Sequence, residues 1–368
     1  MKNTLFLALI ILLSSCQAPS ESTQTLKNTV GQHFAIGCAV NTYTVAISDS
    51  KANRLVTQQF NSIVAENCMK AEKLTPREGV YHWHAADRFV KFGEKNNMRI
   101  IGHCLVWHSQ AAEWMFYDKK GNLVTREVLI ERMRNHIYTV VGRYKGRVYG
   151  WDVCNECVME DGSLRNSLWR QIIGDDYIEL AFRFAHEADP DAELYYNDYS
   201  MTKPAKVQTV CSLVRDFQAK GIRIDAVGMQ CHNGLDYPEL QAWSDAIDSL
   251  AATGVKVNIT ELDMNMLPRA DAFEGAEVSN NFKYRKELDP YRKSIPAEVE
   301  AQINQRWIDI FTLIKAHEHQ IDRVTFWGVH DGMSWLNDWP IKGRKAYPLL
   351  FDRKKNPKPV VQDIMEMF

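Results

Sequence analysis

The sequence lacks the features that mark several large classes of protein. After residue 30 it contains no internal repeat, no low-complexity tract and no linker rich in proline, glycine or serine, so we expect a single domain. A formal net charge of −2 over 368 residues gives no electrostatic reason to expect nucleic acid as a partner. The chain also lacks a Gly-x-Gly-x-x-Gly motif after its first strand-like run, a phosphate-binding loop and a His-x-x-x-His pair. We therefore expect neither a cofactor nor a metal ion.

The cysteines form no recognisable disulfide or metal pattern. Eight occur, and assigning Cys16 to the N-terminal region leaves an odd seven. Most of these lie within apolar runs, where cysteine behaves as a small hydrophobic residue. Cys154 and Cys157 have the Cys-x-x-Cys spacing, but no second pair completes a zinc site. We expect structural free thiols rather than a bridge.

The first sixteen residues have the composition of a secretory signal. Lys2 precedes an apolar run at 5–13, which is too short to span a bilayer. The Leu-Ser-Ser-Cys that follows resembles the bacterial lipoprotein box, which implies a lipid on Cys16 as the only membrane attachment. Gln17 then favours the outer membrane, on the cell surface or the periplasmic face, with cleavage and release as the alternative. We predict a signal peptide at 1–15, a polar tether at 16–30 and a monomeric folded domain at 31–368.

Strand-like and helix-like stretches alternate along the rest of the chain. Apolar residues recur at three- and four-residue steps between 129 and 144 and between 307 and 314, as in helices with one buried face. Strand-like runs occur at 34–40, 62–65, 98–103, 148–155, 193–196, 226–230, 255–260 and 323–327. Eight such units favour a closed (β/α)8 TIM barrel, of class α/β, over a doubly wound open sheet.

Two glutamates stand just past apolar runs of this kind. Glu156 ends the run 149–156, and Glu261 ends the run 255–261. Parallel barrels place their catalytic groups at the carboxyl ends of the strands. Two carboxylates that face one cleft can cleave a glycosidic bond. Taken singly, each would more often be a strand-end glutamate in a surface salt bridge.

Further polar and aromatic clusters fall at the same predicted end of the barrel. His103 or Trp327 alone would more often belong to the core, but the joint pattern favours a binding surface. Amides, imidazoles and a lysine can bond to hydroxyl groups, and indole rings stack on pyranose rings. The clusters lie at 66–70, 103–110, 155–156, 196–199, 230–232, 261–263 and 327–335. This combination is typical of a site for a sugar polymer.

With these seven motifs in this order, the chain resembles glycoside hydrolase family 10, the retaining endo-β-1,4-xylanases, over nearly all of residues 30–365. The resemblance implies a catalytic domain that hydrolyses internal β-1,4-xylosidic bonds of xylan or xylo-oligosaccharides with retention. It implies Glu156 as the acid/base and Glu261 as the nucleophile, supported by Asn155, His232 and Asp263. The implied substrate contacts are Glu66, Asn67, Lys70, His103, Trp107 and Gln110 on the glycone side, with Tyr199, Gln230, Trp327 and Trp335.

Two departures from the family pattern concern subsites rather than catalysis. Ala71 stands where the family usually has tryptophan, and Leu336 stands where arginine often follows Ser-Trp.

The mechanism requires that burial and the nearby Glu261 raise the pKa of Glu156. Hydrogen bonds from His232 and its neighbours should keep Glu261 ionised.

Two alternative functions remain open at this point. A retaining β-1,4-glucanase or mannanase would use the same two carboxylates with other sugar contacts. A non-catalytic glycan-binding lipoprotein would keep the barrel without the chemistry, although such a protein would not need Asn155, Glu156, His232 and Glu261 together.

The stretch 268–296 is long for a loop of such a barrel. Its aromatic residues disfavour disorder. Because the stretch leaves from the Glu261 end of its strand, we expect it to pack beside the cleft and to shape the leaving-group side.

Overall fold

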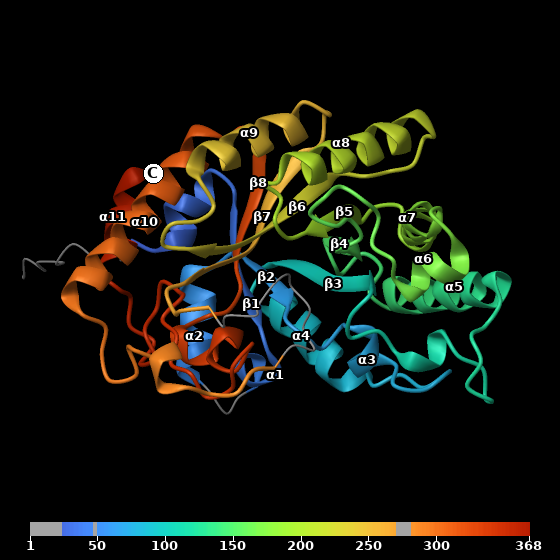
Figure 1. Cartoon of the computed structure of the whole chain (residues 1–368), viewed down its shortest axis with the longest axis horizontal. Coiled ribbons are helices and arrows are strands. Elements are labelled where there is room, and N and C mark those ends of the chain that lie inside the picture. Colours follow the sequence, from blue (N-terminus) through green and yellow to red (C-terminus); the bar gives the residue numbers. More distant parts are fainter. Residues whose placement is uncertain (1–23, 47–49, 270–280) are drawn as a thin grey trace, which may run out of the picture.

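Eight parallel strands close into a barrel in the computed structural model, which describes residues 24–46, 50–269 and 281–368 (Figure 1). Each strand pairs with the next in chain order, and β8 pairs with β1. The strands are β1 (Ala35–Val40), β2 (Ser62–Ala65), β3 (Arg99–Trp107), β4 (Gly150–Asn155), β5 (Glu193–Asp198), β6 (Ala226–Gly234), β7 (Lys256–Asn265) and β8 (Ile321–Phe326). The predicted single-domain (β/α)8 barrel is confirmed.

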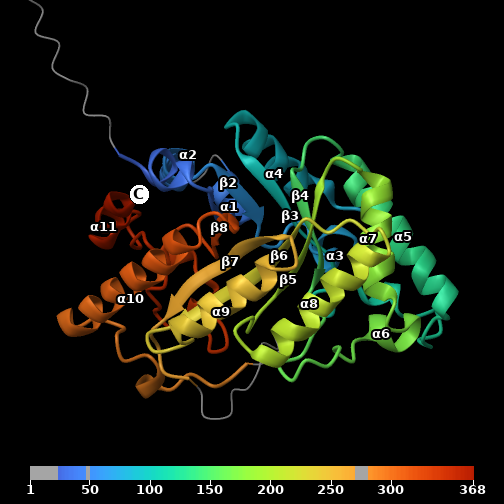
Figure 2. The ribbon, with the colours of Figure 1, turned by 90° about the horizontal axis from the view of Figure 1, so that it is seen from above.

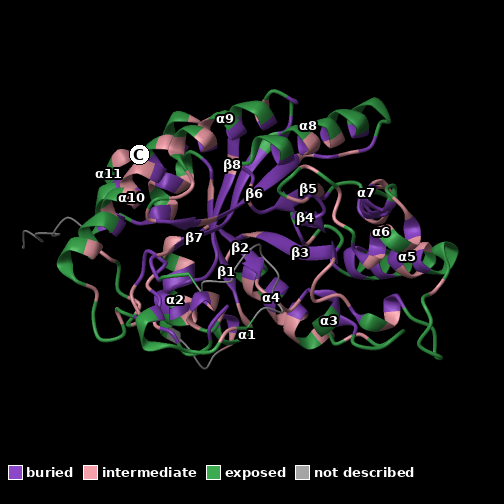
Figure 3. Ribbon diagram, in the orientation of Figure 1, coloured by how far each residue is buried: buried purple, intermediate pink, exposed green. Residues whose placement is uncertain are grey.

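Helices surround the barrel on its outside (Figure 2). They are α1 (Thr42–Val45), α2 (Ser50–Gln59), α3 (Ala71–Leu74), α4 (Trp83–Lys95), α5 (Arg126–Arg143), α6 (Leu168–Ile173), α7 (Tyr177–Ala188), α8 (Pro204–Ala219), α9 (Leu240–Ala251), α10 (Ala297–Ala316) and α11 (Val360–Met367). The buried side of each long helix faces the strands and its exposed side faces outward (Figure 3). The apolar periodicities near 129–144 and 307–314 therefore predicted α5 and α10 correctly.

The hydrophobic core has two layers, as expected of a barrel wrapped by helices. The larger layer lies between the strands and the helices. A smaller cluster fills the barrel interior with residues from β1, β2, β3, β5 and β6 and the residue after β8. Its members are Ala39, Val64, Ile101, Tyr195, Ala226 and Trp327. The barrel interior is thus filled with side chains, and a binding site can form only beyond the ends of the strands.

Three strands continue at least four residues past the positions at which we expected them to end. Strand β3 runs to Trp107, β6 to Gly234 and β7 to Asn265. Each of these strands has a register shift near its polar cluster, after which pairing with a neighbour resumes. The resumed register of β6 and β7 pairs His232 with Asp263. Bulges of this kind re-aim side chains without ending a strand.

The folded part of the chain begins earlier than the predicted boundary at residue 31. Leu26 and Val30 are fully buried in the core, and Leu26 N donates a 3.1 Å hydrogen bond to Oε1 of Gln59. Polar neighbours hide these two apolar residues in the sequence, which is why the segment resembled a tether. The predicted signal peptide and Cys16 lie outside the described residues. Within the described ranges, every helix is too short or too polar to cross a membrane.

All seven cysteines that the structure describes are free thiols. Cys154 and Cys157, which flank the end of β4, are both buried and unbridged. Burial raises the pKa of the Cys154 thiol, so this thiol stays protonated at neutral pH.

Candidate active site

Glu156 and Glu261 occupy the carboxyl end of the barrel, and both have left-handed backbone conformations. Glu156 directly follows β4 with φ 59°, and Glu261 lies at the register shift of β7 with φ 54°. A left-handed φ is unfavourable for residues other than glycine by about 1–2 kcal/mol. Such conformations persist only where the surroundings hold them, and they cluster at active sites. Both side chains are buried, so the backbone turns each carboxylate into the protein rather than into solvent.

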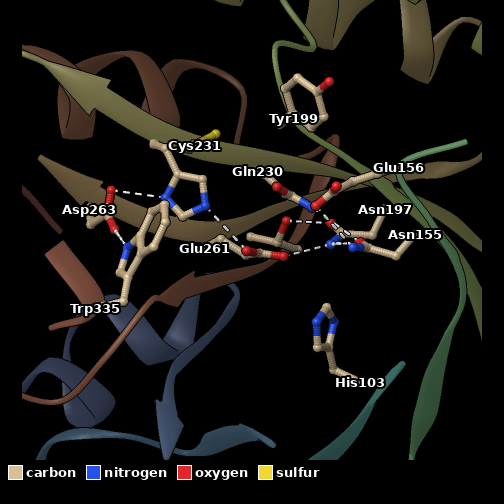
Figure 4. Close-up of polar contacts among 12 residues, drawn as sticks. His103, Asn155, Glu156, Asn197, Tyr199, Gln230, Cys231, Glu261, Asp263 and Trp335 are labelled. Carbon is tan, nitrogen blue, oxygen red and sulfur yellow. Dashed lines mark hydrogen bonds and ion pairs between the residues drawn. The ribbon is translucent and has the colours of Figure 1, made fainter. Parts of the chain in front are cut away.

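Side-chain amides connect the two carboxylates (Figure 4). Asn197 Nδ2 donates to Glu261 Oε1 and to Asn155 Oδ1, both at 2.8 Å. Asn155 Nδ2 in turn donates to Glu156 Oε1 at 3.1 Å. Gln230 Nε2 donates to Asn155 Oδ1 and to Glu156 Oε1, at 3.1 Å each. Three amides from β4, β5 and β6 therefore fix the relative position of the carboxylates.

Asn197 has a specific orientation that two neighbours impose. Thr260 Oγ1 donates a 2.6 Å hydrogen bond to Asn197 Oδ1, which leaves Nδ2 to face Glu261. Gly228 is paired with Asn197 across β5 and β6 and has no side chain that would displace the amide. The sequence placed Asn197 in a strand-end cluster but indicated no role for it, because the role depends on the β5–β6–β7 register.

The environment of Glu156 favours its protonated form. Burial raises the pKa of Glu156 to about 7, and the negative charges of Asp198 and Glu261 act in the same direction. The predicted raised pKa is therefore found, although Asp198 was not expected to contribute to it. Asp198 is itself fully buried, with its Oδ1 2.7 Å from the ammonium group of Lys206. A carboxyl group with this pKa can give a proton near neutral pH and later take one back.

The environment of Glu261 favours its ionised form. Burial opposes ionisation, but hydrogen bonds from His232 and Asn197 and the positive charge of the imidazoles outweigh it and lower the pKa of Glu261. His232 Nε2 lies 3.2 Å from Glu261 Oε2, and Nδ1 lies 3.0 Å from Asp263 Oδ1. Burial also opposes a charge on His232, yet the two carboxylates raise its pKa to about 10. His232 is therefore an imidazolium at neutral pH and donates both bonds.

Asp263 holds this imidazolium in place. Its second oxygen accepts a 2.7 Å hydrogen bond from Trp335 Nε1, and the Trp335 ring lies 4.9 Å from the His232 ring. Trp335 is also stacked on Trp339, with ring centroids 4.4 Å apart. Trp339 was absent from the expected site residues, and only its position four residues after Trp335 could have suggested it.

On one side of the carboxylates, β2 and β3 contribute a polar group of residues around Lys70. Lys70 Nζ donates to Asn67 Oδ1 at 3.0 Å and to Gln110 Oε1 at 2.9 Å, and it lies 4.9 Å from the Trp107 ring centroid. Burial lowers the pKa of Lys70. Asn67 Nδ2 donates to Glu66 Oε1 at 3.2 Å. These residues, predicted from separate motifs, form one hydrogen-bonded unit.

His103 and Trp327 join this side to the barrel interior. The His103 ring meets the Trp327 ring edge to face at 5.3 Å, and His103 Nδ1 lies 2.9 Å from Asp152 Oδ2. Ala71, which replaces the usual tryptophan, lines a small cavity together with Lys70 and Trp107.

On the other side of the carboxylates lies a cavity of about 570 Å³, here called the Trp335 cavity. Its wall combines aromatic, aliphatic and polar side chains and comes mainly from β5 to β8 and the loops that follow them. Tyr199, Gln230, His232, Tyr237, Trp243, Asp263, Pro268, Arg269, Trp335, Leu336, Trp339 and Arg344 are among its lining residues. Leu336, which replaces the usual arginine, packs against Leu267 and Ala346. Pro268 and Arg269 belong to the long stretch 268–296, so the described start of that stretch borders the cleft as expected; residues 270–280 lie outside the described residues.

The site places a proton donor, Glu156, and an ionised carboxylate, Glu261, between the residues around Lys70 and the Trp335 cavity. Every predicted site residue of the barrel is found at its carboxyl end. In the described part of the chain, no group of three or more histidine, cysteine, aspartate or glutamate side chains is arranged to hold a metal ion. The two carboxyl groups have the roles that acid- and nucleophile-assisted cleavage of a glycosidic bond requires.

Comparisons with known proteins agree with this geometry. The model of glycosyl hydrolase family 10 matches residues 25–367. Endo-1,4-beta-xylanase A of Xylanibacter ruminicola is 50% identical over 358 residues, which cover 97% of each chain. A solved family 10 endoxylanase retrieved from a sugarcane soil metagenome superposes with a TM-score of 0.89 at 44% identity, covering 93% of this chain and 100% of that one. A mutant xylanase of Thermoanaerobacterium saccharolyticum, solved with xylotriose, has a TM-score of 0.80 at 34% identity over 94% and 99% of the chains.

Proposed function

The chain belongs to glycosyl hydrolase family 10, and we propose on this premise that it is an endo-1,4-β-xylanase acting by double displacement. It hydrolyses internal β-1,4-xylosidic bonds of xylan with retention of configuration. The observation that carries the proposal is a pair of buried carboxyl groups linked by amides, whose surroundings raise the pKa of Glu156 to about 7 and lower that of Glu261. The relatives named xylanases and the xylotriose complex support the choice of substrate.

In the first step Glu261 attacks the anomeric carbon of the xylose above it. The bond from that carbon to the glycosidic oxygen breaks, and the proton of Glu156 moves to this oxygen, which leaves as a hydroxyl. The product is a glycosyl ester of Glu261. The imidazolium of His232 keeps the attacking carboxylate ionised until the ester forms, because it donates to Glu261 Oε2 at 3.2 Å.

In the second step a water molecule takes the place of the leaving group. Glu156, now ionised, removes a proton from the water, whose oxygen attacks the anomeric carbon and displaces Glu261. Two inversions give net retention. Asn197 stays bonded to Glu261 Oε1 and to Asn155 Oδ1, and so keeps both glutamates in register through both steps.

The sugar chain then lies across both sides of the carboxylates. We assign the glycone to the side of Lys70, where ammonium, amide and carboxylate groups can bond to hydroxyls. We assign the leaving group to the Trp335 cavity, because Gln230 in its wall donates a 3.1 Å hydrogen bond to the acid Glu156. Asn155 is assigned to the 2-hydroxyl of the sugar under attack, and Trp327 and Trp335 form the aromatic walls.

Parallel product analysis tests this function. Linear xylan, arabinoxylan, carboxymethylcellulose and mannan are incubated with the enzyme, and the oligosaccharides released are separated. We expect short β-1,4-xylo-oligosaccharides from the two xylans and little product from the other polymers. Comparable release from carboxymethylcellulose or mannan would instead establish a glucanase or mannanase.

We also propose that the protein is a monomer attached to the bacterial outer membrane by a lipid, and the N-terminal region supports the attachment. The positive residue, the apolar run at 5–13 and Leu-Ser-Ser-Cys ending at Cys16 carry this assignment. Expression with a labelled fatty acid should label the mature protein, and Cys16→Ser should abolish the label. A labelled C16S variant, or a wild type released without lipid, would contradict it.

A further inference from the structure

Arg344 is a buried cation in the wall of the Trp335 cavity. It is 4% exposed, and its guanidinium donates to two main-chain carbonyls, from Nη1 to Pro268 O at 3.1 Å and from Nη2 to Trp339 O at 3.3 Å. Its Nε has no hydrogen-bond partner. Among the described residues it forms no ion pair. A buried charge without a carboxylate partner is unfavourable unless a ligand supplies one.

Asp289, the carboxylate whose charge acts on Arg344, already accepts hydrogen bonds from other residues. Asp289 opposes the lowering of the Arg344 pKa that burial causes. However, Asp289 Oδ2 accepts from Arg292 Nη1 at 2.9 Å, and its Oδ1 accepts from Lys345 N at 3.0 Å. Arg344 therefore contributes a positive charge to this wall without a direct carboxylate contact.

A second guanidinium, that of Arg269, belongs to the wall of the same cavity. Arg269 directly follows Pro268, whose carbonyl Arg344 holds. The Arg269 guanidinium carbon lies 4.2 Å from the centroid of the Tyr237 ring, and Tyr237 also lines the Trp335 cavity. Within the described part of the chain, Arg269 has no acidic partner either. Arg269 and Arg344 together are called the arginine corner.

The chemistry of this corner does not match an undecorated xylose unit. A neutral pentose offers hydroxyl groups, which the amides elsewhere in the cleft already suit. The exposed Arg269 can offer its guanidinium fork to a carboxylate, with which arginine forms bidentate, charge-assisted hydrogen bonds, and Arg344 adds its positive charge. Tyr237 and Trp339 add aromatic ring surface to the same cavity wall.

We propose that the arginine corner binds the carboxylate of a uronic acid side group carried by the leaving-group part of the xylan chain. This proposal rests on the proposed function, since it assigns a substrate class to the same cleft. It makes Arg269 and Arg344 specificity-determining residues for acidic xylan. Neither residue takes part in bond cleavage.

The test compares two substrates that differ only in charge. Xylo-oligosaccharides bearing glucuronate side groups are used as such and after reduction of the carboxyl group to a primary alcohol. In the wild type kcat/KM should be higher for the acidic substrate. In Arg269→Gln the ratio of acidic to reduced kcat/KM should fall about tenfold, the effect of losing a charge-assisted hydrogen-bond pair. Arg269→Lys should keep part of the preference, and Arg344→Lys should weaken it.

Lys342→Gln is the matched control, because Lys342 is exposed, close in sequence to Arg344 and not part of the cavity wall. It removes the same charge and should leave the ratio unchanged. An equal fall in K342Q and R269Q, or no fall in R269Q while its circular dichroism is that of the wild type, would overturn the proposal. A wild type that hydrolyses neither linear xylan nor the reduced substrate would instead refute the xylanase assignment.

Discussion

A methyl group on Gly228 would lie 2.3 Å from Oδ1 of Asn197, so glycine is required where β6 passes the amide that bonds to the nucleophile. The Asn197 side chain cannot move away without losing hydrogen bonds, because its Oδ1 accepts from Thr260 and its Nδ2 donates to Glu261. We predict that Gly228→Ala lowers kcat by about tenfold to hundredfold, the usual effect of displacing a group that orients a catalytic residue. Steady-state kinetics on an aryl xylobioside measure this.

Gly142→Ala provides the control for this substitution. Gly142 lies in α5, and an added methyl group would meet no atom within 4 Å. This variant should gain about 0.5–1 kcal/mol of stability and keep its activity. Equal kinetics for G228A and the wild type would show that Asn197 does not position Glu261.

A second prediction concerns the hydroxyl group of Thr260. Thr260→Val keeps the shape of the side chain but removes the donor to Asn197 Oδ1. The amide then loses its fixed orientation, and we expect kcat to fall while KM changes little. Thr260→Ser should restore activity, because it returns the hydroxyl. A loss of thermal stability with unchanged kcat would indicate a purely structural threonine.

The roles of the two glutamates predict different kinetics in their variants. Glu261→Ala should abolish turnover even of substrates with good leaving groups, because no ester can form. Glu156→Ala should spare the first step with an activated aryl glycoside, after which the glycosyl-enzyme accumulates and azide restores turnover. Mass spectrometry detects the ester. Identical behaviour of the two variants with azide would contradict the assignment.

The pH profile should respond to Asp198. Its negative charge helps to raise the pKa of Glu156 to about 7, so neutralising it lowers that pKa. The acid then loses its proton at lower pH, and the alkaline limb of kcat/KM for unactivated xylan moves to lower pH in Asp198→Asn. The double variant with Lys206→Met removes both buried charges and checks that an unpaired Lys206 is not the cause. An unmoved limb in both variants would exclude Asp198 from the tuning of Glu156.

Stability at acid pH should depend on His136. Its two ring nitrogens have no hydrogen-bond partner in the described structure, and burial lowers its pKa to about 4. Because the unfolded chain binds a proton at a pKa of about 6.5, the stability present at neutral pH is lost as pH falls from there toward 4. The loss attributable to this group is about 2–3 kcal/mol at about pH 4.5.

Replacing His136 by leucine should therefore flatten the acid limb of the stability profile. Chemical denaturation at about pH 7 and about pH 4.5 measures the change in unfolding free energy, with His319→Leu, at an exposed position, as the comparison. An acid loss in H136L as large as in the wild type would show that other groups cause it.

The barrel and its catalytic glutamates were predictable because both depend on local patterns. Alternating strands and helices fix a (β/α)8 fold, and a carboxylate just past a strand lies at its catalytic end. The roles of Asn197 and Gly228 could not be predicted, because they arise from the register between β5, β6 and β7. Leu26 and Val30 were missed for a similar reason: two apolar residues among polar ones acquire meaning only from what they pack against.

The docking of Leu26 also determines how far the enzyme could work from a membrane. Leu26 bonds to Gln59 at the end of α2, just before β2 begins, so the chain enters the barrel at the end opposite Glu156 and Glu261. With a lipid on Cys16, the ten peptide units to Leu26 span at most about 35 Å. The cleft would then open away from the bilayer, and the tether would keep the barrel close to the membrane surface. Such an enzyme would hydrolyse polysaccharide close to the membrane and could not reach polysaccharide far from it.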